Sequence, residues 1–214
     1  WNAKCLCIRI KQSYLVSMQK VVVIKYNAGN IYSVVHALRR LGVEPVVTAD
    51  EAVIRASDKV IFPGVGEATT TMRFLKERKM DELITSLTQP VLGICLGMQL
   101  MCKSSEEGNV DCLGIFDVPV KLFVPTQQTQ KIPHMGWNQL YDVKSNLFSE
   151  QLNEQFVYFV HSFYVPMCEH TIATTDYIQP FSAALNKNNF YATQFHPEKS
   201  GDVGEQILKN FLAL

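Results

Sequence analysis

The chain has no excess of charge of either sign and no long apolar run. Its 20 basic and 20 acidic residues give a formal net charge of zero over 214 residues. Because proteins that bind nucleic acid need a basic surface to neutralise phosphates, we expect no nucleic-acid partner. No stretch approaches the roughly 20 apolar residues of a membrane-spanning helix, so we expect no membrane insertion either.

The sequence also lacks the spacing of common metal and nucleotide sites. Its six cysteines form no CxxC pair, and its histidines form no HExxH pattern. A domain of this size needs no disulfide framework, so we expect reduced thiols and a cytoplasmic protein with no metal and no other cofactor. The glycine-rich stretch FPGVGEATT at 62–70 contains neither GK[ST] nor GxGxxG, which argues against a phosphate loop.

Residues 1–17 differ in texture from the rest of the chain. They mix Lys4, Arg9 and Lys11 into apolar positions, unlike the apolar core of a signal peptide. We expect them to be a non-native or upstream leader, and residues 18–214 to form a single domain. The alternative is an extra N-terminal strand or helix that packs on the domain.

The first half of the chain alternates strand-like and helix-like segments. VVVIKY, EPVVTA, KVIFPGVG and PVLGI read as strands, and apolar residues at helical spacing follow the first and third of them. This alternation predicts a parallel sheet covered on both faces. After about residue 108 strand-like runs dominate until a final amphipathic helix, so we expect a three-layer α/β/α fold whose mostly parallel central sheet is extended by antiparallel strands.

A cysteine stands between two glycines where the fourth strand meets a helix. Gly93, Cys95 and Gly97 reproduce the G-x-S-x-G nucleophile elbow with a thiol in place of the hydroxyl. Glycines tolerate the strained turn that exposes the nucleophile, and the amino end of the helix favours the thiolate. The alternative is a buried structural cysteine on a glycine-containing turn.

A second pattern, ATQFHPEKS, lies before the final helix. Pro197 restricts His196 to an extended conformation, which lets His196 and Glu198 point to the same side. A carboxylate beside an imidazole is the arrangement of a nucleophile triad, although His-Pro-Glu alone is more often a loop feature. Combined with the elbow, it predicts a catalytic triad of Cys95, His196 and Glu198.

The glycine-rich stretch after the third strand offers backbone N–H groups. We expect the segment Gly64, Val65 and Gly66 to approach the substrate closely, and the N–H groups of Val65 and Leu96 to form an oxyanion hole.

Taken in order, these motifs closely resemble those of the class I (triad) glutamine amidotransferases, with GICLGMQ at 93–99 and HPE at 196–198. The finer resemblance is to the glutaminase subunit of imidazole glycerol phosphate synthase, through YNAGN, PGVG, HMGWN, YFVHSFY and QFHPEKSG. The chain departs from that pattern at Lys25 and at the stretch Glu67–Thr69.

The resemblance implies that the chain hydrolyses glutamine. Cys95 would attack the side-chain amide, His196 would protonate the departing ammonia, and Glu198 would orient His196. The residues expected near the substrate are Gly64, Gly66, Gln99, His161 and Ser162. Gln99 lies one helical turn after Cys95 and so on the same face, whereas His161 and Ser162 are equally consistent with ordinary strand residues.

The resemblance also implies a partner, a separate (βα)8 cyclase subunit that receives the ammonia in a heterodimer, with low glutaminase activity until that partner binds its nucleotide. The candidates for the docking face and site entrance are Asn30, Met135, Trp137, Asn138, Tyr158 and Lys199. For Trp137 a core position is the alternative. Three other functions remain open: a glutaminase subunit for another ammonia-dependent synthase, a cysteine hydrolase with the same elbow, and a non-catalytic regulatory subunit.

Overall fold

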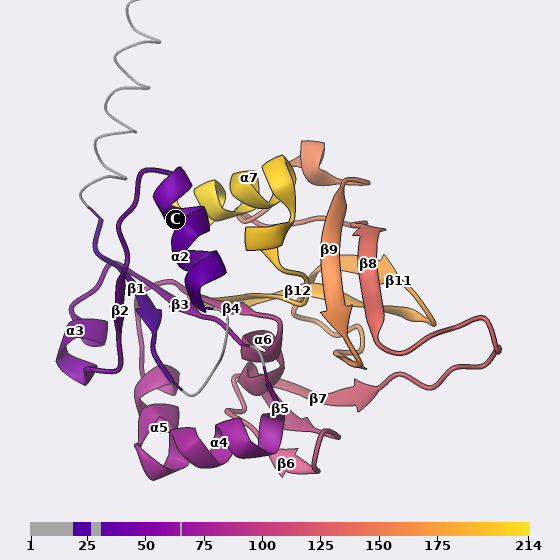
Figure 1. Ribbon diagram of the computed structural model, residues 1–214, viewed down its shortest axis with the longest axis horizontal. Coiled ribbons are helices and arrows are strands. Elements are labelled where there is room, and N and C mark those ends of the chain that lie inside the picture. Colours follow the sequence, from indigo (N-terminus) through magenta and orange to yellow (C-terminus); the bar gives the residue numbers. More distant parts are fainter. Residues whose placement is uncertain (1–18, 27–30, 65) are drawn as a thin grey trace, which may run out of the picture.

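The computed structural model describes residues 19–26, 31–64 and 66–214, and a central sheet of seven strands organises it (Figure 1). The strand order is β11-β12-β13-β4-β3-β1-β2. The strands are β1 (Val21–Ile24), β2 (Val46–Thr48), β3 (Lys59–Phe62), β4 (Val91–Ile94), β11 (Thr171–Asp176), β12 (Pro180–Lys187) and β13 (Phe190–Thr193). The first four and β13 run parallel, whereas β12 runs antiparallel to both of its neighbours, β11 and β13, so antiparallel pairs extend the sheet as the sequence predicts.

Helices cover both faces of this sheet, so the three-layer prediction is confirmed (Figure 1). On one face lie α2 (Ile31–Arg40) and α7 (Gly201–Leu212). On the other lie α3 (Glu51–Arg55), α4 (Ala68–Glu77), α5 (Met80–Thr85) and α6 (Leu96–Met101). Successive side chains of a strand point to opposite faces, so Val21 and Val23 pack towards α2 and α7 while Val22 and Ile24 pack towards the other helices.

The second half of the chain does not all join the central sheet, contrary to the simplest interpretation of its strand-like runs. A separate four-stranded sheet has the strand order β10-β7-β5-β6. Its strands are β5 (Cys102–Ser105), β6 (Val110–Asp111), β7 (Phe116–Leu122) and β10 (Phe163–Tyr164). A separate antiparallel pair consists of β8 (His134–Gln139) and β9 (Phe156–His161). Two 3-10 turns, η1 (Glu150–Leu152) and η2 (Pro197–Lys199), complete the elements. Local pattern identifies a strand, but the partner of that strand depends on contacts distant in sequence.

The proposed leader, residues 1–17, lies outside the described residues, so its fate remains a prediction. None of the helices in the described ranges combines the length and apolar character needed to cross a membrane.

Candidate active site

The predicted catalytic residues gather at one edge of the central sheet. Cys95 follows β4 and His196 follows β13, and β4 and β13 are adjacent parallel strands. The segment after β3 reaches the same edge, because β3 pairs with β4 on its other side. Carboxyl ends of parallel strands are where α/β proteins build their sites, since loops and helix N-termini converge there.

Cys95 occupies a strained turn between β4 and α6. Its φ is 52° and its ψ is −108°, a conformation that a non-glycine residue seldom adopts, and it is the residue immediately before the helix. A Cβ added at Gly97 would collide with the carbonyl oxygen of Phe62, and one at Gly93 would lie 2.9 Å from the sulfur of Met101. The two glycines are therefore required because the elbow packs directly against β3 and its own helix, and the predicted elbow is present.

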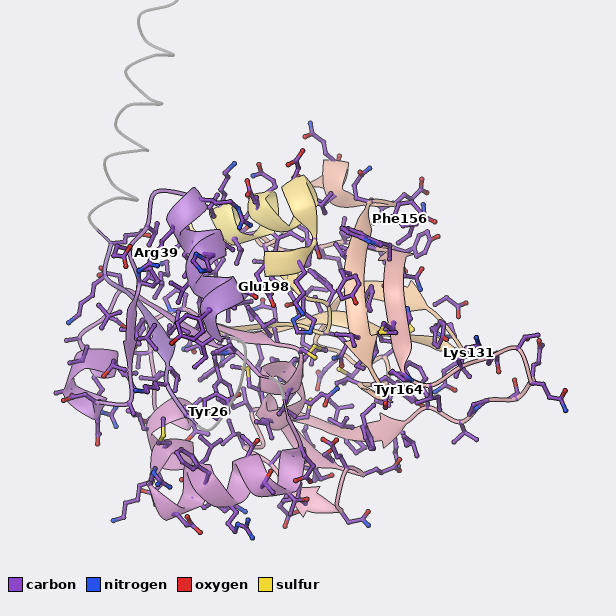
Figure 2. The ribbon with its side chains drawn as sticks, in the orientation of Figure 1. Tyr26, Arg39, Lys131, Phe156, Tyr164 and Glu198 are labelled. Atoms are coloured by element: carbon purple, nitrogen blue, oxygen red, sulfur yellow. The ribbon has the colours of Figure 1, made fainter. Side chains whose placement is uncertain are left out.

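His196 and Glu198 form a buried pair. The His196 Nδ1 atom lies 2.7 Å from Glu198 Oε1, and their side chains are 2% and 3% exposed. His196 is extended, with φ −98° and ψ 96°, and the proline after it opens the turn η2 that carries Glu198. Figure 2 shows Glu198 near the centre of the molecule, beneath α2 and α7.

The electrostatic environment favours a protonated His196. Burial acts to lower the pKa of this imidazole, but the neighbouring Cys95 and the carboxylate of Glu198 outweigh it and raise the pKa to about 10. The Nε2 atom is buried without a hydrogen-bond partner among the described residues, so it is free to exchange a proton with a bound substrate. This arrangement can supply both a general acid and a base.

Strand β9 holds the His196 turn in place. The N–H of His196 donates to the carbonyl oxygen of Tyr158 at 2.9 Å, and the N–H of Tyr158 donates to Ser200 Oγ at 3.0 Å. The Ser200 hydroxyl in turn donates to the carbonyl oxygen of His196. A displacement of β9 would therefore move the histidine as well.

The glycine-rich segment after β3 lies against the elbow. A Cβ at Gly64 would lie 2.6 Å from the Leu96 Cβ, so Gly64 serves a close approach to α6 and is not among the residues that line the cavity. Gly66, with φ +125°, does line it. Val65, one predicted oxyanion donor, lies outside the described residues. The other donor, the N–H of Leu96, is in the first turn of α6, where N–H groups have no intrahelical acceptor.

These residues surround a cavity of about 360 Å³, within the range of small-molecule sites. Its lining includes eight residues that the sequence singles out: Gly66, Cys95, Leu96, Gln99, His161, Ser162, His196 and Lys199. It also includes four that the sequence analysis does not: Glu107, Pro133, Val160 and Phe163.

The amide of Gln99 is more deeply engaged in the protein than a simple substrate ligand would be. Its Nε2 donates to the carbonyl oxygen of Phe163 at 2.9 Å and to Gln194 Oε1 at 3.0 Å. No donor among the described residues reaches Gln99 Oε1, which leaves that oxygen as the atom available to a ligand.

His161 belongs to a chain of hydrogen bonds rather than to an isolated strand position. Its Nδ1 lies 2.7 Å from the carbonyl oxygen of Phe163, and its Nε2 lies 3.1 Å from His134 Nδ1. Asn138 Nδ2 then lies 3.3 Å from His134 Nε2. Because a carbonyl can only accept, Nδ1 of His161 carries its proton. An amide nitrogen can only donate, so His134 Nε2 accepts from Asn138 and His134 Nδ1 donates to His161 Nε2. Each ring then has one donor and one acceptor nitrogen and is neutral. Burial lowers the pKa of His134 to about 4 and that of His161 to about 3.

The docking candidates separate into exposed and internal residues. Met135 and Trp137 are 66% and 55% exposed on β8, so a core position for Trp137 is excluded. Asn138 instead turns inward, donating to the carbonyl oxygen of Asp176 at 2.9 Å. The Trp137 and Tyr158 rings lie 6.0 Å apart, and Lys199 Nζ lies 5.9 Å from the Tyr158 ring. Asn30 lies outside the described residues.

Three residues that the sequence analysis missed contribute to the site. Glu107 places a half-buried carboxylate at the cavity, where burial raises its pKa. Tyr26 follows β1, and its hydroxyl donates to the carbonyl oxygen of Pro63 at the start of the glycine-rich segment. Burial, followed by the proximity of Cys95, raises the pKa of Tyr26 far above its usual range. Gln194, two residues before His196, is fully buried beside the thiol.

The departure at Glu67 has a structural role. Its carboxylate accepts hydrogen bonds from the N–H groups of Thr69 and Thr70 at 2.7 and 2.8 Å, and so caps the amino end of α4. This capping explains the acidic residue without reference to the chemistry of the site.

Comparisons with known proteins give matches over most of the chain. The family model "Glutamine amidotransferase class-I" matches residues 22–214. A protein of Bacteroides fragilis named imidazole glycerol phosphate synthase subunit HisH is 69% identical over 195 residues, which are 91% of this chain and all of the relative. A protein of the same name from Bacteroides thetaiotaomicron is 67% identical with the same coverage.

The solved structures show the same fold at lower identity. A putative GMP synthase subunit from Thermoplasma acidophilum superimposes with a TM-score of 0.70 at 20% identity, covering 91% of this chain and 93% of that chain.

Proposed function

The chain belongs to the class I glutamine amidotransferases, and from that premise we propose that it is the glutaminase subunit of an imidazole glycerol phosphate synthase in histidine biosynthesis. It hydrolyses glutamine to glutamate and ammonia, and a cyclase subunit consumes the ammonia. The observation that carries the proposal is that Cys95 and His196 line one cavity, with Glu198 hydrogen-bonded to His196, in a chain 69% identical to a subunit of that synthase.

In the first half of the reaction the Cys95 sulfur attacks the side-chain carbonyl carbon of glutamine. The carbonyl oxygen acquires negative charge, which the N–H of Leu96 and, as we infer, that of Val65 stabilise. The His196 imidazolium donates its Nε2 proton to the nitrogen of the tetrahedral intermediate, so the carbon–nitrogen bond breaks and ammonia leaves. A γ-glutamyl thioester on Cys95 remains.

In the second half water replaces ammonia. The now neutral Nε2 of His196 takes a proton from a water molecule as that water attacks the thioester carbon. Collapse of this intermediate releases glutamate and regenerates the thiolate and imidazolium. Throughout, Glu198 Oε1 accepts a hydrogen bond from the Nδ1–H group of His196, with 2.7 Å between the two heavy atoms, which fixes the ring and stabilises its charged form.

The backbone end of glutamine needs partners of opposite charge. We assign its ammonium group to the Glu107 carboxylate and the unengaged Gln99 Oε1, because both residues line the cavity. The half-buried Glu107 carboxylate gains from a cationic ligand, since pairing offsets the desolvation that raises its pKa.

The ammonia acceptor is a separate cyclase subunit, which we place on the exposed side of β8. Met135 and Trp137 expose large apolar surfaces there, and such residues commonly anchor protein interfaces. The row Trp137, Tyr158 and Lys199 leads from this surface to the rim of the cavity. Since the backbone of Tyr158 also holds His196, a partner that presses on β9 can adjust the catalytic histidine.

The function is tested by measuring glutamate release from glutamine by the purified chain, alone and with a histidine-pathway cyclase subunit and its ribonucleotide. We expect release chiefly in the presence of partner and ligand, and none from Cys95→Ala. Full release without a partner would be consistent with a glutaminase, but it would contradict the assignment to this pathway and the dependence of activity on the partner. No release under any condition would instead favour a regulatory subunit or another hydrolase.

The docking face is tested by titrating the cyclase subunit against Trp137→Ala. We expect affinity to fall about tenfold or more, as for a central aromatic anchor. Met167→Ala is the matched control, because Met167 is likewise 55% exposed but lies between β10 and β11, outside the β8–β9 pair. Unchanged affinity in folded Trp137→Ala would rule out this face.

A further inference from the structure

A buried amide lies against the catalytic sulfur. Gln194 is 0% exposed, and its Nε2 lies 3.7 Å from Cys95 Sγ, within hydrogen-bonding distance of sulfur. Its backbone N–H donates to the carbonyl oxygen of Ala183 at 2.8 Å, which fixes the residue beside β12. Burying an amide is costly unless its polar atoms are hydrogen-bonded, and the sulfur is the hydrogen-bond partner that the structure gives to Gln194 Nε2.

The orientation of this amide follows from one backbone carbonyl. The oxygen of Phe163 can only accept, so the Gln99 atom that faces it at 2.9 Å must be the donor Nε2. The second proton of that nitrogen points to Gln194 at 3.0 Å, so the Gln194 atom there must be the acceptor Oε1. The remaining end of the Gln194 amide, the donor Nε2, consequently faces the sulfur.

The carbonyl oxygen that orients the Gln99 amide has no free lone pair. The carbonyl oxygen of Phe163 also faces His161 Nδ1 at 2.7 Å, so both of its lone pairs have donors. Reversing the Gln99 amide would bring two oxygens together beside a buried ring. The donor at Cys95 is therefore imposed by the fold and does not depend on a free choice of amide orientation.

Two polar neighbours of the sulfur respond oppositely to its ionisation. The carbonyl oxygen of Val160, 3.9 Å from Sγ, can accept from a thiol but repels a thiolate. The Nε2 donor of Gln194 binds a thiolate more strongly than a thiol, because hydrogen bonds to charged acceptors are the stronger ones. Loss of the proton thus exchanges a Val160 contact for a Gln194 contact.

We propose that Gln194 is a positioning residue for the nucleophile, whose amide N–H stabilises the Cys95 thiolate and holds the sulfur ready for attack. Its consequence for turnover rests on the glutaminase function proposed above, but the contact itself can be tested without it. Other titratable groups also face the cavity or the sulfur, namely Tyr26, Glu107, His161, His196 with Glu198, and Lys199. All of them stay in place when Gln194 alone is replaced.

The test measures the rate at which iodoacetamide alkylates Cys95 as a function of pH, with the peptide that contains Cys95 quantified by mass spectrometry. Gln194→Met keeps the side-chain length and removes the donor. We expect the midpoint of the profile to rise by about one pH unit, the size of effect expected from one charge-assisted hydrogen bond. Below that midpoint alkylation should slow about tenfold.

The matched control is Gln89→Met, the same substitution at a half-buried amide that donates to the carbonyl oxygen of Ile54 at 2.9 Å, beside the amino end of β4. We expect its alkylation profile to coincide with that of the unmodified chain. If Gln194→Met does not fold, Gln99→Met decides the matter, because it frees the Gln194 amide from its anchor and should shift the midpoint in the same direction.

A folded Gln194→Met with an unshifted midpoint would overturn the proposal, as would an unshifted Gln99→Met where that variant decides. With the cyclase partner present, Gln194→Met should lower kcat about tenfold and leave KM nearly unchanged. A shifted midpoint in a chain that releases no glutamate under any condition would keep the Gln194 contact and refute the glutaminase. An unshifted midpoint in an active glutaminase would refute the Gln194 contact alone.

Discussion

Two buried neutral histidines should make the fold sensitive to mild acid. His134 and His161 are 3% and 6% exposed, and burial lowers their pKa values to about 4 and about 3. An unfolded ring titrates near 6.5. Because both folded values lie below the unfolded one, the rings contribute their full stability above about pH 6.5 and lose it as the pH falls.

The magnitude follows from proton linkage. Between pH 6.5 and about 4.5 these two rings bind up to two more protons in the unfolded chain than in the folded chain. The free energy of unfolding should therefore fall by at most about 2.7 kcal/mol per pH unit. From pH 7 to pH 5 the loss is at most about 4 kcal/mol, a large part of a typical stability of about 5–15 kcal/mol. His196 opposes the trend near pH 7, because its raised pKa keeps the folded ring protonated while the unfolded ring loses its proton above about pH 6.5. Glu107, whose pKa is also raised, opposes the trend as well.

The assay is equilibrium denaturation in urea at pH steps from 7 to 5, with the slope of stability against pH as the readout. His134→Gln should reduce the slope from about two protons to about one, whatever its effect on stability at pH 7. Tyr177→Leu is the matched control, because it removes the ring stacked 4.1 Å from His134 but keeps both histidines. A slope near zero in the unmodified chain, or one unchanged by His134→Gln, would refute the reasoning.

Three further substitutions separate the elbow, the helix cap and the triad. Gly97→Ala forces a Cβ into the carbonyl oxygen of Phe62, so we expect thermal denaturation to show about 1–3 kcal/mol less stability and glutamate release to be lost; an active, stable variant would contradict this packing. Glu67→Ala removes the cap of α4 and should cost about 1 kcal/mol in urea denaturation without affecting release by the assembled enzyme. Glu198→Gln removes the carboxylate 2.7 Å from His196 and should lower kcat by about 10²- to 10⁴-fold with a small change in KM; a normal kcat would exclude Glu198 from the triad.

Much of the central sheet can be predicted from the sequence because its signals are local. The run VVVI is buried on both faces as β1, and the apolar spacing that comes after it forms α2. The elbow can be predicted for the same reason, since a strand, a cysteine between glycines and a helix are contiguous. The second half is harder because β5, with the polar sequence CKSS, pairs in parallel with β7, and nothing within either segment indicates the other.

The site shows the same division. Some of its contacts join residues close in sequence and can be predicted, whereas others join residues that only the fold brings together. His196 and Glu198 lie two positions apart and can be paired from the sequence, but Gln194 acquires its role through Gln99 and Phe163, which are 95 and 31 positions away in the chain. An amide has both a donor and an acceptor end, so the sequence cannot indicate which end will face a sulfur. The orientation is set by a carbonyl of the backbone, which every residue possesses and which no pattern of side chains marks. The polarity around Cys95 is consequently a property of the assembled fold, and the motifs that contain Gln99 and Gln194 do not by themselves indicate it.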